Sequence, residues 1–194
     1  QLRDDKLFRQ PDESHLGECP ICCLPLPIDE RKRIINTCCS KRICIGCDHA
    51  NTLREKEGGL EHVCPFCREP VPKTDEEIDQ NDMKRVKAND PVAIRYQADD
   101  CYREGDYEGA FEYLSKAAEL GEIDAHYNLS VLYREGKGVE REPKKEVYHL
   151  EIAAIAGHAK ARFNLGNHEG RNKRYERAVK HWVIAAKLGH DEAL

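Results

Sequence analysis

The chain has 194 residues, of which 35% are charged, and its formal net charge is -5. With a mean hydropathy of -0.75, it is expected to be soluble, with one or two domains, and its acidic balance argues against nucleic-acid binding. No apolar stretch approaches the roughly 20 residues that span a bilayer, and residues 1–15 lack the apolar core of a secretory signal, so neither a membrane segment nor export is expected. Because the first residue is Gln1, we expect a fragment or a processed chain.

Composition divides the chain into four segments. They are a polar leader (1–17), a cysteine block (18–70), a charged connector (71–89) and a helical region (90–194). Nine of the ten cysteines lie in the second segment, and only Cys101 lies outside it. A cysteine-poor helical region about twice as long follows, and no export signal precedes, so we expect reduced thiols and a cytoplasmic or nuclear location.

The cysteine block contains four pairs, and their spacing predicts two zinc ions. The pairs are separated by 15, 4 and 16 residues, and three of them are C-x-x-C, which places two thiolates at adjacent vertices of a tetrahedron. The short central gap favours a cross-brace, in which pairs one and three share one zinc ion and pairs two and four share the other. The predicted ligands are Cys19 and Cys22, Cys38 and Cys39, Cys44 and Cys47, and Cys64 and Cys67. Four thiolates close the coordination shell, so the zinc is expected to be structural.

Several alternatives to this ligand set remain open. Adjacent ligands strain a loop, so His62 or His49 could replace Cys38 or Cys39 at the second site. The thiols could also be reduced core residues, whereas a redox C-x-x-C needs a βαβ context that is absent from the pattern. We interpret Cys23 as a spare thiol and Cys101 as a small apolar residue of a helix.

The residues around three of the pairs resemble the RING family of zinc domains. The matching stretches are Cys19-Pro20-Ile21-Cys22, Ile43-Cys44-Ile45-Gly46-Cys47 and Cys64-Pro65-Phe66-Cys67-Arg68. The commonest RING pattern has a histidine where this chain has Lys41, so the block is more similar to all-cysteine RING domains, with Cys38 as the substitute ligand.

The resemblance implies a ubiquitin ligase, or a ligase subunit, that docks a ubiquitin-conjugating enzyme. By position, Ile21 and Pro65 would supply apolar contact, and Arg68 matches the arginine that bonds both the conjugating enzyme and ubiquitin. The alternative is a non-catalytic zinc-binding scaffold for protein–protein interaction, in which Ile21 and Pro65 stiffen the knuckles and Arg68 is a solvated charge.

The connector is expected to contain a short charged helix that ends near Lys87. Thr74 can cap its start, and Glu77 can reach back to complete a capping box.

The region from residue 90 repeats an alanine-rich motif three times, and each copy ends in glycine. The copies are 116–121, 152–157 and 184–189, and the glycines lie 36 and 32 residues apart. This period is typical of a helix-pair solenoid. Proline begins two helices, at Pro91 and Pro143, and the glycines should form left-handed caps.

These motifs, and the loop Tyr133-Arg134-Glu135-Gly136-Lys137-Gly138-Val139, resemble Sel-1-like repeats, a subfamily of the tetratricopeptide superfamily. We expect three units, with residues 191–194 starting a fourth. First helices should line the concave wall and hold a protein substrate or adaptor. The predicted contact residues there are Tyr127, Asn128, Arg162 and Asn164, with core packing as the alternative for Tyr127. The expected fold is therefore a small zinc-stabilised RING-like domain with little regular structure, joined to an all-α helical-repeat solenoid.

Overall fold

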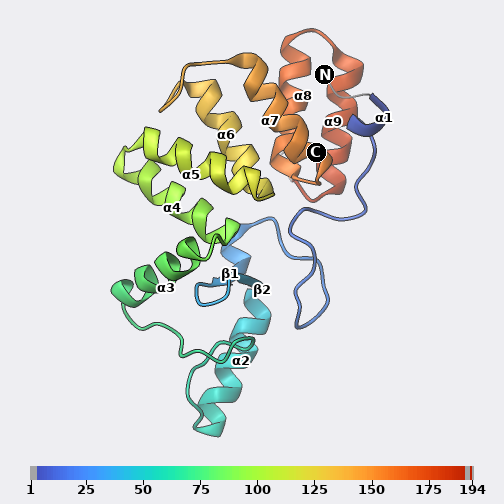
Figure 1. Ribbon diagram of the computed structural model, residues 1–194. Helices are drawn as coiled ribbons and strands as arrows, with labels where there is room; N and C mark the ends of the chain where they lie inside the picture. Colours follow the sequence, from blue (N-terminus) through green and yellow to red (C-terminus); the bar gives the residue numbers. More distant parts are fainter. Residues whose placement is uncertain (1–3, 191–192, 194) are drawn as a thin grey trace.

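The computed structural model describes residues 4–190 and 193, and it divides into an N-terminal segment, a cysteine-rich unit and a helical array (Figure 1). The predicted start of a fourth repeat comprises residues 191–194. Of these, only Ala193 is among the described residues. Within the described residues, no helix has the length and apolar character needed to cross a membrane.

The helical array is a solenoid of three helix pairs. The pairs are α4 (Pro91–Glu104) with α5 (Tyr107–Glu119), α6 (Ile123–Glu135) with α7 (Pro143–Ile155), and α8 (Ala159–Arg171) with α9 (Tyr175–Lys187). Gly121, Gly157 and Gly189 have φ of 91°, 89° and 89°, which confirms the predicted left-handed caps. Pro91 begins α4 as expected, and the side chain of Asp90 accepts hydrogen bonds from the next free backbone N–H groups. The solenoid predicted from the repeat period is confirmed.

Small residues allow the helices of a pair to approach closely. Ala117, Ala153 and Ala185 are fully buried in the alanine-rich motifs. A Cβ atom on Gly166 of α8 would overlap the indole of Trp182 on α9, so only glycine fits there. Larger residues such as Leu129 and Leu132 fill the spaces between pairs. Each unit thus buries its apolar face against its neighbours.

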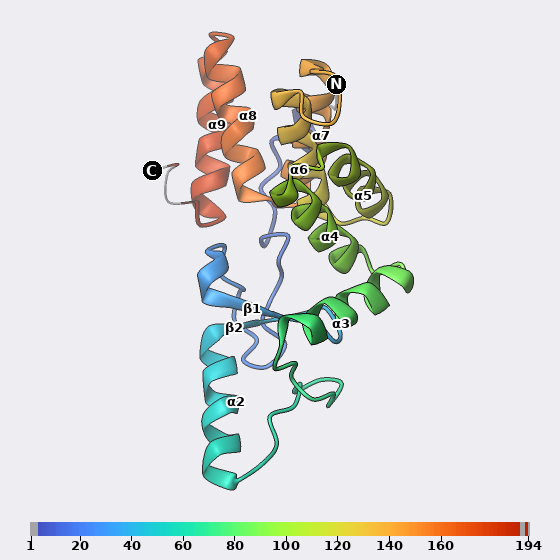
Figure 2. The ribbon, with the colours of Figure 1, turned by 90° about the vertical axis from the view of Figure 1, so that its left-hand side faces the viewer.

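The cysteine-rich unit is built from one hairpin and one helix. Strand β1 (Arg33–Asn36) follows the short 3-10 helix η1 (Glu30–Lys32) and pairs antiparallel with β2 (Lys41–Cys44), so that Ile34 lies opposite Ile43. Helix α2 (Ile45–Gly58) follows directly and projects away from the solenoid (Figure 2). Helix α2 differs from the expectation of little regular structure in this unit. It could not be predicted from an apolar stripe, because Glu55 is its sole buried residue.

The connector helix α3 spans Asp75–Lys87, as the capping signal predicts. The Thr74 hydroxyl accepts from the N–H of Glu77 at 3.3 Å. The Glu77 carboxylate accepts from the N–H of Lys73 at 2.7 Å, one residue before the expected partner. Helix α3 packs against α4 and leads into the first repeat.

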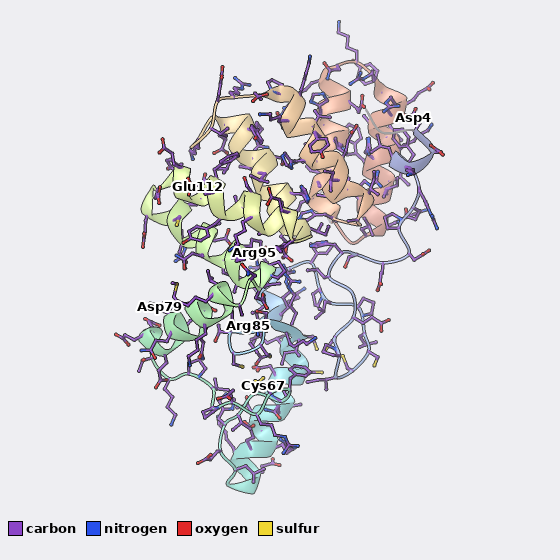
Figure 3. All side chains as sticks on the ribbon, viewed as in Figure 1. Asp4, Cys67, Asp79, Arg85, Arg95 and Glu112 are labelled. Atoms are coloured by element: carbon purple, nitrogen blue, oxygen red, sulfur yellow. The ribbon has the colours of Figure 1, made fainter. Side chains whose placement is uncertain are left out.

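A buried ionic cluster fixes the cysteine-rich unit to the solenoid. Arg42 of β2 donates to Glu122 at 3.0 Å and to Asp124 at 3.4 Å, and Arg95 of α4 lies 3.4 Å from Glu122. His15 Nε2 lies 2.7 Å from Asp124. Figure 3 shows Arg95 where α4 meets the hairpin. We call Glu122, Asp124, Arg42, Arg95 and His15 the joint.

A buried neutral histidine should make the solenoid sensitive to acid. His181 is 0% exposed, and burial, together with the charges of Arg162 and Arg177, lowers its pKa to about 3. The unfolded chain therefore takes up a proton near pH 6.5 that the folded chain refuses, so stability is complete above that pH and falls below it. At about pH 5 the loss from this group is roughly 2 kcal/mol.

Denaturant unfolding, followed by helical signal at about pH 7.5 and pH 5, checks this expectation against His181→Gln. The variant should lose less stability between the two pH values than the wild-type chain does. Equal losses in both proteins would show that His181 does not contribute to the pH dependence.

Candidate metal centre and docking groove

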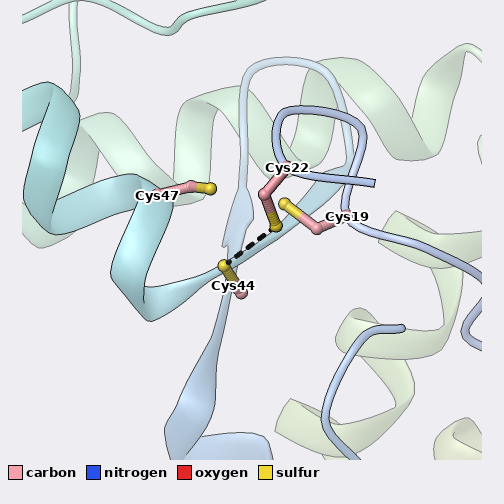
Figure 4. Close-up of side chains that lie close together, drawn as sticks. All are labelled: Cys19, Cys22, Cys44 and Cys47. Carbon is pink, nitrogen blue, oxygen red and sulfur yellow. Dashed lines mark hydrogen bonds between the residues drawn. The ribbon is translucent and has the colours of Figure 1, made fainter. Parts of the chain in front are cut away.

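The first group of thiols comprises Cys19, Cys22, Cys44 and Cys47. Their Sγ atoms all lie within 4.8 Å of one another, and those of Cys22 and Cys44 are 3.9 Å apart (Figure 4). A loop closed by the Glu18–Pro25 bridge supplies the first two. The other two come from the end of β2 and the first turn of α2.

The second group comprises Cys38, Cys39, Cys64 and Cys67. Cys38 and Cys39 lie in the turn between β1 and β2, and the other two lie in a loop closed by the Val63–Pro70 bridge. Sγ of Cys39 lies 3.7 Å from that of Cys64, and Sγ of Cys38 lies 3.3 Å from that of Cys67. The structure therefore brings together pairs one and three, and pairs two and four, the groupings expected for a cross-brace.

The sulfur positions suit tetrahedral zinc. With a Zn–S bond of about 2.3 Å, the edge of a regular tetrahedron is about 3.8 Å. Two of the three Sγ–Sγ separations given above, 3.7 and 3.9 Å, lie close to this value, and the third is shorter at 3.3 Å. All ten cysteines are free thiols, so each group offers four donors to one ion.

Backbone hydrogen bonds favour thiolate at the first cysteine of each loop. Burial opposes ionisation of Cys19, but N–H groups of Cys22, Cys44 and Ile21 outweigh it and lower its pKa to about 6. Burial also opposes ionisation of Cys64, whose pKa is nevertheless lowered by N–H groups of its own loop. The pKa of Cys47 rises to about 12, first through its hydrogen bond with Cys44. Thiols this close cannot all ionise unless a cation lies between them, which is the charge that Zn²⁺ would supply.

The histidines considered as alternative ligands lie outside both groups. His62 Nδ1 lies 2.5 Å from the buried carboxylate of Glu55, and His49 is exposed on α2. Cys23 is exposed beside the first loop, whereas Cys101 is buried in α4, as expected for a small apolar residue.

The three residues expected to contact a partner line one open groove. Ile21 is 45% exposed, and it lines the groove with Pro65 and Arg68, both exposed. The groove has a volume of about 850 Å³. Its far wall is α2, which contributes Ala50 and Arg54, and the exposed Leu60 just after α2 also lines it. None of these three residues was predicted from the sequence. The helix-forming residues 53–57, after the third cysteine pair, are the signal from which α2 could have been predicted.

A third cluster joins His15, Asp124 and His158, whose nearest ligand atoms also lie within 4.8 Å. His158 Nδ1 accepts the N–H of Ala161 at 3.1 Å, so the neutral ring carries its proton on Nε2. That Nε2–H points to Asp124 at 3.4 Å and has no lone pair for a metal. The cluster is therefore a hydrogen-bonded part of the joint.

The predicted contact residues on the first helices do not form an open wall. Arg162 is 0% exposed, so its assignment as a surface contact is wrong. The N-terminal segment covers Arg162, and no local sequence pattern predicts the contact between them. Asn128 donates to Asp99 at 3.2 Å, Tyr127 stacks on His158 at 4.6 Å, and Asn164 is half-buried.

The comparisons with known proteins agree with the helical architecture. The Sel1 repeat family model matches residues 87–122, 123–158 and 159–190. The chain belongs to the Sel1 repeat family. Each matched Sel1 repeat contains one helix pair, α4–α5, α6–α7 or α8–α9. Stacked helix pairs of this kind form extended surfaces that suit protein–protein interaction. Cysteine block 18–70 lies outside the match.

A solved structure shows the same fold. The crystal structure of a Sel1 repeat protein from Oxalobacter formigenes is similar over 77% of this chain, with 22% identity and a TM-score of 0.56. The chain covers 60% of the length of that protein. At this identity the similarity concerns the fold alone.

Proposed function

We propose that this Sel1 repeat chain is a zinc-binding, RING-type ubiquitin ligase or ligase subunit. The observation that carries the proposal is the groove, because Ile21, Pro65 and Arg68 were assigned from their positions beside the cysteines and all three line it. The groove lies against both metal centres, since Cys47 of the first group and Cys64 of the second also line it.

The eight cysteines of the two groups would hold two zinc ions. The ions would stabilise the two loops and α2, since a four-thiolate shell leaves no position for substrate or water. Any chemistry must therefore come from a docked partner. A conjugating enzyme brings its own ubiquitin thioester, and this chain positions it.

Each wall of the groove has a role in that positioning. Ile21, Leu60 and Pro65 offer apolar surface within one groove, and exposed apolar side chains that gather in this way are typical of docking sites. Arg68 is exposed, with φ of 62°, at the rim, where its planar guanidinium can donate to two acceptors at once. The joint then holds the docked enzyme at a fixed place relative to a protein bound on the Sel1 repeats.

Arg68→Ala is expected to slow ubiquitin discharge from a loaded conjugating enzyme by about tenfold or more, because each hydrogen bond to a charged group contributes about 1.5 to 3 kcal/mol. The measurement is single-turnover discharge with a panel of conjugating enzymes. Lys41→Ala is the matched control, since this exposed cation lies outside the groove. The control should keep wild-type discharge, and both variants should keep their zinc.

The non-catalytic scaffold is the second candidate, and the Sel1 family assignment favours it directly. It predicts that the wild-type chain discharges ubiquitin from no conjugating enzyme, or that Arg68→Ala changes nothing. Absence of discharge by the wild-type chain would rule out the ligase proposal. Unchanged discharge in Arg68→Ala would rule out the role proposed for Arg68, and both results leave the thiol groups and the repeats as described.

A further inference from the structure

The N-terminal segment, residues 4–9, lies on a surface formed by α7, α8 and α9. It begins with the four-residue helix α1 (Asp4–Leu7), which Figure 1 shows beside α8 and α9, away from the cysteine-rich unit. The segment precedes every matched repeat, so the solenoid holds a piece of chain that is not one of its own units.

Arg162 of α8 recognises the main chain of this segment. Its guanidinium donates to the carbonyl oxygen of Leu7 and, at 3.4 Å, to that of Arg9. The residue is 0% exposed, and its Nε atom is buried with no hydrogen-bond partner among the described residues. A buried arginine directed at main-chain carbonyls can hold any peptide in this path, since every residue offers that acceptor.

Two side chains of the segment occupy separate positions on the surface. Leu7 is 1% exposed and packs among Leu150, Ala153, Ala154, Ala161 and Leu165. The ring of Phe8 lies 4.7 Å from that of His181, and the cations of Arg177 and Lys180 lie 4.8 and 5.3 Å from its centre. These contacts select a leucine followed by an aromatic residue.

A charge contact completes the recognition. Asp4 lies 2.6 Å from Nη1 of Arg177, whose Nε donates to Glu169 at 3.0 Å. The surface thus recognises the carboxylate of Asp4 and, three and four residues later, the side chains of Leu7 and Phe8.

The segment is joined to the rest of the chain by a short linker. Asp12 and Glu13 in this linker are exposed. The next attachment is at His15, whose N–H donates to the carbonyl of Gly157 at 3.3 Å. Residues 4–9 therefore form a distinct attachment, with its own contacts.

We propose that the surface around Arg162 is a peptide-binding site, occupied here by the chain's own residues 4–9. In a complex, a partner segment with a carboxylate followed three and four residues later by leucine and phenylalanine replaces it. The inference rests on the partner-binding role of the repeats in the proposed function. It requires neither zinc nor ubiquitin transfer.

The test frees the tethered segment by cutting the chain after it has folded. A cleavage site for a sequence-specific protease is inserted between Asp12 and Glu13, the chain is cut, and the freed fragment is removed by dialysis. Binding of a fluorescent peptide with the sequence of residues 4–10 is then measured by anisotropy, with no conjugating enzyme present. A peptide carrying Leu7→Ala and Phe8→Ala is the matched control, so folding of the protein is not perturbed.

The cut chain should bind the peptide saturably. The uncut chain should bind it at least about tenfold more weakly, because its tethered segment competes at a high effective concentration. The control peptide should bind at least about tenfold more weakly to the cut chain, because it lacks the two apolar side chains that pack on the surface. Equal binding by cut and uncut chains, a fragment that never leaves, or no binding by a cut chain that keeps its helices would each overturn the inference. Ubiquitin discharge by the uncut chain is measured separately, so either proposal can fail alone.

Discussion

Removal of zinc by a strong chelator is expected to unfold residues 18–70 and to leave the solenoid helical. The cysteine-rich unit has a small core, centred on Leu16, Cys19, Leu26 and Ile43. Two of its loops, residues 18–25 and 63–70, each contain two cysteines of the thiol groups. The apparent binding energy of structural zinc in small domains is about 10 kcal/mol or more at neutral pH, which exceeds what such a core supplies. The repeats bury their own alanine and leucine faces and need no metal.

Cys64→Ser tests the same point at one site. Cys64 is 0% exposed, so the variant should lose zinc from the second group and the ordered structure around Val63 and Pro70. Cys23→Ser is the matched control, because this thiol is exposed and belongs to neither group. Amide hydrogen exchange should show fast exchange across the cysteine-rich unit in Cys64→Ser and slow exchange in α4–α9. A unit that stays protected without zinc would contradict the structural role of the metal.

Asp124→Asn is expected to cost about 3 to 5 kcal/mol of folding stability. Burial works against ionisation of Asp124, but hydrogen bonds from His15 and His158 outweigh it and hold its pKa well below the usual range. Asparagine keeps the shape but removes the charge, which leaves Arg42 with Glu122 alone, and Arg95 with Glu122 and Asp99. Breaking a buried ionic cluster from one side has this magnitude because the remaining charges lose their partner.

The measurement is denaturant unfolding of the helical array, with Asp100→Asn as the control. Asp100 pairs with Arg103 on the exposed surface of α4, where side-chain exposures are 42% and 76%, so its loss should cost less than about 1 kcal/mol. Hydrogen exchange should also rise at β2 and at residues 15–19 in Asp124→Asn, since both attach at the joint. Similar stability in the two variants would mean that the joint does not hold the parts together.

The repeats were predictable because their signal is local and recurs. Each copy of the motif buries its first alanine, which is Ala117, Ala153 or Ala185, and ends in a glycine with φ near 90°. The thiol groups were predictable from spacing, since strand β2 spans the short gap between Cys39 and Cys44 and places the two pairs at opposite ends of the hairpin. Their geometry is compatible with the two proposed zinc sites.

The contacts made by residues 4–17 could not be predicted from the sequence. Leu7 and Phe8 are isolated apolar residues in a polar stretch, and no periodicity marks them. Their partners, Arg162 and His181, lie more than 150 residues away in the chain, where they read as ordinary helix-surface residues. The joint could not be predicted for the same reason, because Arg42 and Asp124 come together only when the folded units meet.

The most direct test of the two-zinc cross-brace is native mass spectrometry of the chain purified under reducing conditions. We expect two zinc ions per chain, retained in Ile21→Ala and Lys41→Ala, and one fewer in Cys38→Ser. A folded chain that carries no zinc, or one in which disulfides join the C-x-x-C pairs, would contradict it.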